Sequence, residues 1–226
     1  CIYVFISLIK TNHKMNFFKY SFIISLGILF SCTDEKTSHE NENGLTDGAT
    51  KQFTKIGVEE SNIPFKNTVK EDLEFNFLNY TYLYTGAGVA VGDFDQDGLE
   101  DMYLTSNFGP NKMYKNKGDF VFEDITKVSK TEDYQGFTTG ATALDINNDG
   151  WLDIYVSKAG SLKSDDGRRN KLFVNQKDGT FKEEAKAWGI DDPGYSTQAY
   201  SLDYDRDGDL DLYVVNYRYD FKNNTK

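Results

Sequence analysis

One acidic segment occurs three times in the chain, and this repetition constrains the fold more than any other feature of the sequence. The three copies are GVAVGDFDQDGLEDMYL (88–104), GATALDINNDGWLDIYV (140–156) and QAYSLDYDRDGDLDLYV (198–214). The first aspartates of their central loops, Asp93, Asp145 and Asp203, lie 52 and then 58 positions apart. Self-similarity at such a period is the signature of a protein built from repeated supersecondary units.

A second element repeats together with the acidic segment. NKMYKNKGDFVFED (111–124) matches NKLFVNQKDGTFKE (170–183). It begins 18 residues after the first loop aspartate in one copy and 25 residues after it in the other. The extra residues fall in the polar stretch GSLKSDDGRR (160–169), and surface loops tolerate such insertions. The two elements therefore belong to one repeating unit.

Each unit predicts four short strands, which in the first copy are VAVGDF, DMYLTS, NKMYKN and FVFEDI. Four-stranded repeats of this length predict blades of a β-propeller. The alternative is a tandem array of small β-modules, but a module of about 55 residues without a disulfide can bury only a marginal core. An aromatic content of 15% with only 3 Pro also favours β-structure.

We therefore expect an all-β fold over residues 53–226, a partial β-propeller of four-stranded blades. Phe53–Ile56 resembles the last strand of a repeat. This resemblance predicts that the chain enters with a final strand, as in propellers that close by sharing one blade between the two chain ends.

The repeated loops carry oxygen-bearing side chains at positions 1, 3, 5 and 9, glycine at position 6, and a backbone carbonyl available at position 7. The candidate ligands are Asp93, Asp95, Asp97, Leu99 and Asp101 in the first loop, Asp145, Asn147, Asp149, Trp151 and Asp153 in the second, and Asp203, Asp205, Asp207, Asp209 and Asp211 in the third. Ligation by oxygen alone selects a hard cation, and six to eight flexible oxygens suit Ca²⁺ better than Mg²⁺. We expect about one calcium ion per repeat, at three sites.

The loops have two other interpretations. Asp, Asn and Gly also form ordinary turns without a metal, although carboxylates packed this densely repel one another when nothing compensates them. An EF-hand needs a bidentate Glu at position 12 and two flanking helices. Position 12 is Leu104, Val156 or Val214, and the flanks are strand-like.

The rare residues and the net charge exclude several classes of function. The cysteines are Cys1 and Cys32 and the histidines are His13 and His39, so neither residue occurs after position 39. That region can build no disulfide framework, zinc cluster, or Ser-His or Cys-His catalytic pair. A net charge of −11 disfavours a nucleic-acid partner, because the surface repels phosphates.

The N-terminal region predicts export. We expect residues 1–14 to be upstream translation, 15–31 a signal peptide with an uncharged run after Lys19, and 32–52 an acidic flexible tether. LFSC resembles a bacterial lipobox, apart from Phe30, so Cys32 is the expected site of lipidation. An ordinary signal peptide or an uncleaved anchor are the alternatives. The acids after Cys32 resemble export signals of surface lipoproteins in Bacteroidetes-type bacteria.

The loop GDFDQDGLED, the NKLFVNQKDGTF element and the period together resemble FG-GAP/VCBS repeats, the propeller blades of integrin α-chains and of many bacterial surface proteins. Residues 65–94 resemble bacterial relatives of cartilage acidic protein, in which an ASPIC/UnbV domain follows the propeller. The resemblance implies that the loop carboxylates bind Ca²⁺ and that the propeller is a binding or adhesion module. No ASPIC/UnbV domain is visible, and the third repeat stops at NNTK, so we expect an N-terminal part of a longer reading frame.

These observations predict a calcium-binding, lipid-anchored, non-catalytic β-propeller at the outer membrane or cell surface of a Bacteroidetes-like bacterium. Its expected partners are a protein or glycan ligand and, through the lipid, the membrane. The main alternative is a propeller-based lyase or hydrolase whose active site lies in the missing C-terminal part; a purely structural role is a third. Tyr103, Tyr155 and Tyr213 recur at equivalent positions, which predicts packing within the blades rather than ligand contact.

Overall fold

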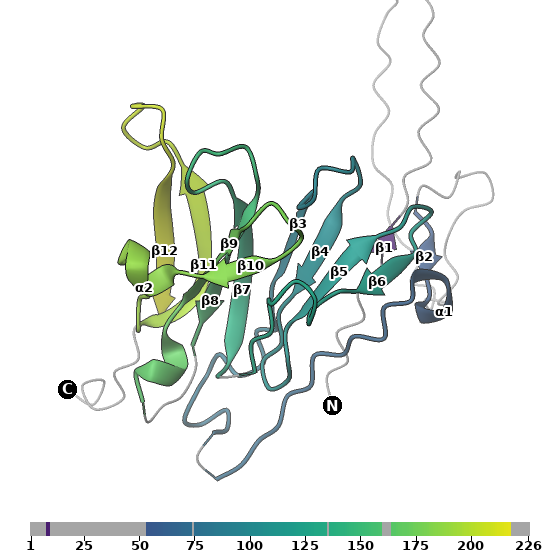
Figure 1. Ribbon diagram of the computed structural model, residues 1–226. Helices are drawn as coiled ribbons and strands as arrows, with labels where there is room; N and C mark the ends of the chain where they lie inside the picture. Colours follow the sequence, from purple (N-terminus) through teal and green to yellow (C-terminus); the bar gives the residue numbers. More distant parts are fainter. Residues whose placement is uncertain (1–7, 10–52, 74, 135, 160–163, 218–226) are drawn as a thin grey trace, which may run out of the picture. The chain divides into compact units, whose positions relative to one another are not determined.

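The computed structural model describes residues 8–9, 53–73, 75–134, 136–159 and 164–217 (Figure 1). The predicted signal peptide, the lipidation site Cys32 and the tether lie outside the described residues. Within them, no helix is long and apolar enough to span a bilayer.

The described residues fold into antiparallel β-sheets that follow the sequence repeats. The first repeat forms a four-stranded sheet in the order β3 (Val89–Gly92), β4 (Asp101–Leu104), β5 (Lys112–Asn116) and β6 (Phe122–Asp124). The second repeat forms an equivalent sheet from β7 (Thr138–Leu144), β8 (Asp153–Lys158), β9 (Lys171–Asn175) and β10 (Phe181–Glu183). The third contributes the hairpin of β11 (Tyr195–Leu202) and β12 (Asp211–Tyr217). The predicted all-β class is confirmed, and so are the four strands in each of the first two repeats.

Three short helical turns lie outside the strands of the described residues. α1 (Val58–Ser61) precedes the first repeat, the 3-10 turn η1 (Asp166–Arg168) lies in the inserted loop of the second, and α2 (Ala185–Trp188) follows β10. A separate pair of strands, β1 (Leu8–Ile9) and β2 (Lys55–Ile56), is antiparallel. Lys55–Ile56 is thus a strand, and its described partner comes from the segment that we expected to be upstream translation.

The first strands of the three repeats lie against one another. β3 contacts β7, and β7 contacts β11. A β-carbon on Gly88 would lie 2.6 Å from the Cα of Gly140, and one on Gly140 would lie 2.7 Å from the carbonyl oxygen of Thr197. Glycine is required at both positions because the neighbouring backbones leave no room for a side chain. The Thr142 hydroxyl also donates to the Ala199 carbonyl at 2.7 Å, which fixes β7 against β11.

The recurring tyrosines form the centre of the first two sheets. Tyr103 and Tyr155 are fully buried, and their hydroxyls donate to the carbonyls of Thr131 and Ile190. The structure thus packs these two tyrosines in the core, as expected. The side chain of Tyr213 is 62% exposed, contrary to the expectation, because no described strand of the third repeat covers it.

A linker aspartate joins each of the first two sheets to the sheet that follows. Asp133, between β6 and β7, forms a buried ion pair with Lys158 at the end of β8. The equivalent Asp192, between α2 and β11, accepts a hydrogen bond from Asn216 near the end of β12. The main-chain carbonyls of both aspartates accept the N–H of an asparagine that precedes the third strand, at 3.2 Å and 3.0 Å. The repeat therefore extends to the junctions between sheets.

Candidate metal centres in the acidic loops

The three acidic loops share one backbone conformation. Each connects the first two strands of its repeat, and Figure 1 shows these hairpins with their loops at the same end. Positions 4 and 6 have positive φ in every loop: Gln96 and Gly98 (59° and 86°), Asn148 and Gly150 (54° and 85°), Arg206 and Gly208 (65° and 96°). Glycine at position 6 adopts this left-handed conformation without steric cost.

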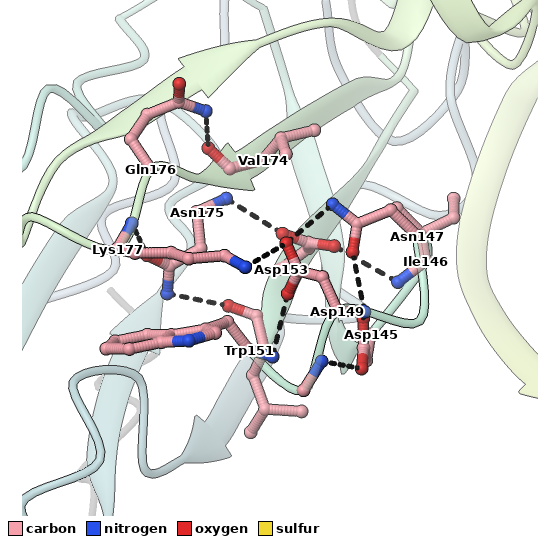
Figure 2. A network of polar contacts seen from close by, with 12 residues as sticks. Asp145, Ile146, Asn147, Asp149, Trp151, Asp153, Val174, Asn175, Gln176 and Lys177 are labelled. Atoms are coloured by element: carbon pink, nitrogen blue, oxygen red, sulfur yellow. Dashed lines mark hydrogen bonds and ion pairs between the residues drawn. The ribbon is translucent and has the colours of Figure 1, made fainter.

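The carboxylate at position 1 closes the turn. Asp93 accepts the N–H of Asp97 at 3.0 Å and that of Gly98 at 2.9 Å. Asp145 accepts the equivalent pair, from Asp149 at 3.0 Å and Gly150 at 2.7 Å (Figure 2). The loops are therefore held partly by side chain to backbone hydrogen bonds of the Asx type.

The carboxylate at position 9 is buried in the first two loops. Asp101 accepts the N–H of Phe94 at 3.3 Å and that of Asn116 at 2.8 Å. Asp153 accepts the equivalent N–H groups, from Ile146 and Asn175. Burial raises the pKa of Asp101 and that of Asp153 to about 6, although these N–H donors act in the opposite direction. Because removal from water penalises the charged form, a cation beside either carboxylate would be favourable.

In the third loop, Asp211 at position 9 keeps the bond to position 2, from Tyr204 N–H at 2.8 Å, but its side chain is exposed. The third loop therefore shares the bond from position 2 to position 9 with the other two, but Asp207 N–H donates to Asp205 at position 3, at 3.3 Å.

Three carboxylates gather at one point in two of the loops. Oxygen atoms of Asp93, Asp95 and Asp101 lie within 4.8 Å of one another, and so do oxygen atoms of Asp203, Asp205 and Asp211. Oδ1 of Asp95 is buried and has no hydrogen-bond partner. Buried oxygens normally have a partner, so a cation with oxygen ligands fits this site. In the second loop Asn147 takes the place of Asp95, and its amide donates to Asp149 at 3.0 Å.

The main-chain N–H at position 7 makes a contact that the sequence did not predict. It donates to the carboxylate at position 5 in each loop: Leu99 to Asp97 at 3.0 Å, Trp151 to Asp149 at 2.9 Å, and Asp209 to Asp207 at 3.1 Å. The predicted ligand at this position is the carbonyl, which stays a prediction. The position-5 carboxylates keep one oxygen outside this bond.

Sequence reasoning missed two lysines that reach the loops. The Lys115 ammonium, on β5, contacts Asp95 and also lies 3.2 Å from Oδ2 of Asp97. Lys177 lies 3.1 Å from Oδ2 of Asp149 (Figure 2). The hydrogen bond with Lys115 lowers the pKa of Asp97. Both lysines are in the second repeated element. Its basic residues were the sequence feature that could have predicted these contacts with the loop carboxylates.

A recurring asparagine of that element was also missed. The Asn116 side chain donates to the Glu100 carbonyl at 2.9 Å, and that of Asn175 donates to Leu152 at 3.1 Å and to Phe94 of the first loop at 2.8 Å. Together with the bond from Gln96 to Gly150, at 2.8 Å, this contact connects the first two loops. The recurrence in NKMYKN and NKLFVN was the signal that could have found it.

The fold and the loops define a protein built from antiparallel β-repeats, each with an aspartate-rich loop between its first two strands. A family model of the FG-GAP-like repeat matches residues 93–156 and 160–214, more than half of the chain. The chain belongs to the family of proteins with FG-GAP-like repeats.

The chain is also similar to cartilage acidic protein 1 from several vertebrates, as the sequence resemblance predicted. It is 36% identical to the Xenopus tropicalis protein and 33% identical to the Homo sapiens protein over 72 residues, which is 31% of this chain and 11% of each relative. It is 23% identical to the Mus musculus protein over 139 residues, 59% of this chain and 20% of that protein. The chain thus aligns with a fifth or less of the length of these relatives.

Proposed function

We propose that the chain is a calcium-binding, non-catalytic binding or adhesion module, in which each acidic loop holds one Ca²⁺ ion. The observation that carries the proposal is the unpartnered buried oxygen of Asp95 within a cluster of three carboxylates. Oxygen-only ligands favour a hard cation, and flexible loops favour calcium over magnesium. The side chains at positions 1, 3, 5 and 9 would hold the ion, and the ion would neutralise the repulsion among them.

The three sheets would be blades of a β-propeller. The contacts of β7 with β3 and β11 support this arrangement, because the first strands of propeller blades line a common axis. The repeated linker contacts of Asp133 and Asp192 support it as well, because they join successive sheets in the same way.

The proposed surface for a protein or glycan ligand lies before the first repeat. The rings of Phe77 and Tyr84 stack with centroids 6.2 Å apart, and both side chains are exposed. The carboxylate of Glu71 accepts the Phe77 N–H at 3.3 Å, and its hydrogen bond with Tyr84 raises the pKa of that tyrosine. Exposed aromatic rings beside a carboxylate suit a ligand with both apolar and hydrogen-bonding faces.

The proposed setting is a lipid anchor at Cys32 and a position at the outer membrane or cell surface. The alternative function, a propeller-based lyase or hydrolase, would place its active site outside the residues described, and no observation on the described residues favours it.

Calorimetry of the full chain tests the proposal. Chelation should lower the melting temperature, Ca²⁺ should restore it, and Mg²⁺ should restore it poorly. Extracellular calcium modules bind at roughly 10⁻⁴ to 10⁻³ M, and a ligand at about 100 times its Kd stabilises the folded state by about 2.7 kcal/mol per site. An unchanged melting temperature, with no calcium found by elemental analysis, would reduce the loops to metal-free Asp-Gly turns.

A further inference from the structure

We infer that Lys115 is an internal competitor of calcium in the first loop, so that this loop stays ordered without the metal and binds it more weakly than its carboxylates alone would. The inference rests on the proposed calcium function and adds a regulating residue to it. It predicts that the three loops differ in affinity, although their backbones are alike.

The Lys115 ammonium already occupies two of the candidate calcium ligands. Lys115 contacts the carboxylate at position 3, Asp95, and approaches the carboxylate at position 5, Asp97, at 3.2 Å. Its side chain is 26% exposed, so the contact is partly shielded from solvent. A divalent ion among Asp93, Asp95 and Asp101 would share the Asp95 carboxylate with the ammonium. Lys115 holds Oδ2 of Asp95 and the ion would bind the unpartnered Oδ1, so the two positive charges would repel across one carboxylate and the lysine contact would oppose the ion.

The need to displace the lysine lowers the apparent affinity of the first loop for calcium. If only a fraction of molecules has the ammonium away from Asp95, the measured dissociation constant rises by the inverse of that fraction. The same contact has the opposite effect on the metal-free protein. The first loop also contains Glu100, which with its four aspartates makes five acidic side chains within nine residues. The ammonium neutralises part of that charge when no metal is bound.

The second loop supplies an internal comparison. The residue equivalent to Lys115 in the second repeat is Val174, which has no charge. Lys177, from a different position, reaches Asp149 alone and is 45% exposed. Lys115 contacts carboxylates at positions 3 and 5 and is 26% exposed, whereas Lys177 contacts only the position-5 carboxylate, so the competition should be stronger in the first loop than in the second.

The test is a calcium titration of the full chain, starting from chelated protein and followed by calorimetry. Lys115→Met should strengthen one of the three sites by about tenfold, the change expected when roughly 1.4 kcal/mol of competing interaction is removed. Lys112→Met is the matched control, because Lys112 lies on the same strand and pairs with Asp124 at 2.7 Å, outside the loop. This control should leave all three affinities unchanged. In an Asp93→Asn background, which disables the first loop, Lys115→Met should have no effect on the remaining sites.

Melting temperatures give a second readout that a purely structural salt bridge would not produce. In chelator, Lys115→Met should melt below the wild type; in excess calcium, the difference should vanish or reverse. Lys115→Gln, which keeps a polar side chain and removes the charge, should behave in the same way and guards against loss of folding in the Met variant. If the wild type binds calcium and the Lys115 variants bind it equally or more weakly, the inference is overturned and the proposed function stands. If the wild type binds no calcium, both are overturned.

Discussion

Replacing Asp133 by asparagine should destabilise the chain more than replacing an exposed acidic residue. The Lys158 ammonium lies 2.7 Å from Oδ2 of Asp133, and the two side chains are 2% and 1% exposed. Lys171 lies 3.3 Å from the other carboxylate oxygen. Asparagine keeps the shape of the side chain and removes its charge, which leaves the buried lysine without this counter-charge. Removing one partner of a buried pair costs about 3–5 kcal/mol, a large part of a typical domain stability of roughly 5–15 kcal/mol.

The pH dependence of this penalty identifies its cause. Burial lowers the pKa of Lys158, whereas the charge of Asp133 acts in the opposite direction. In Asp133→Asn that opposing contribution is absent, so the folded-state pKa falls further below its unfolded value of about 10.4. Between the two pKa values the unfolded chain binds more protons, and stability therefore rises with pH. The penalty of Asp133→Asn should be largest near pH 7 and should shrink as the pH is raised toward about 9.5.

Chemical denaturation at fixed calcium concentration, at both pH values, measures these free energies of unfolding. Asp124→Asn is the matched control, because its partner Lys112 is partly exposed, and an exposed pair contributes about 0–1 kcal/mol. The double variant Lys158→Met with Asp133→Asn should recover most of the lost stability, since it no longer buries a charge. A penalty below about 1 kcal/mol, a penalty independent of pH, or a double variant as unstable as the single one would refute the reasoning.

Three further predictions concern the lipid, the contact between sheets and the metal. Cys32→Ala should abolish labelling of the protein with a palmitate analogue, and equal labelling of the variant would rule out Cys32 as the acylated residue. Gly140→Ala should cost about 1–3 kcal/mol, because the new methyl group meets the Thr197 carbonyl, whereas Gly57→Ala meets nothing within 4 Å and should cost little; equal unfolding free energies would contradict the tight packing of β7 on β11. Asp95→Ala should lower the calcium stoichiometry from three ions to two, and a retained third ion would remove the first loop from the metal sites.

The repetition in the sequence predicted the local structure well, because every copy contains the information needed to form it. The period and the strand-like runs predicted the four-stranded sheets, and the equivalent positions of Tyr103 and Tyr155 predicted their burial. The exposure of Tyr213 was not predictable from its own repeat, since burial of a side chain depends on the strands that lie beside it.

The contacts between elements could not be predicted from the repetition. Lys115 reaches the first loop because β5 pairs with β4 in a register that sets Tyr114 opposite Met102, and that register is a property of the folded sheet. The pair of Asp133 and Lys158 joins residues that are 25 positions apart, and no spacing rule relates a linker to the end of a strand in the next repeat. Such contacts follow from packing rather than from periodicity.

Comparison of equivalent positions indicates which features the fold requires. At the first junction between sheets, Asp133 pairs with the charged Lys158. At the equivalent second junction, Asp192 pairs with the neutral Asn216. The loops vary in the same way, with Asp95 in the first and Asn147 in the second. The hydrogen bonds from positions 2 and 7 to the loop carboxylates are the same in all three loops, so the backbone geometry does not depend on these charges. The repeats therefore share a scaffold and differ in local charge, and charge is the property that sets how strongly an oxygen cage binds a cation. It follows that the first two loops should bind calcium with unequal affinities, and that the lysine beside each loop, Lys115 or Lys177, should contribute to that order together with the loop sequence.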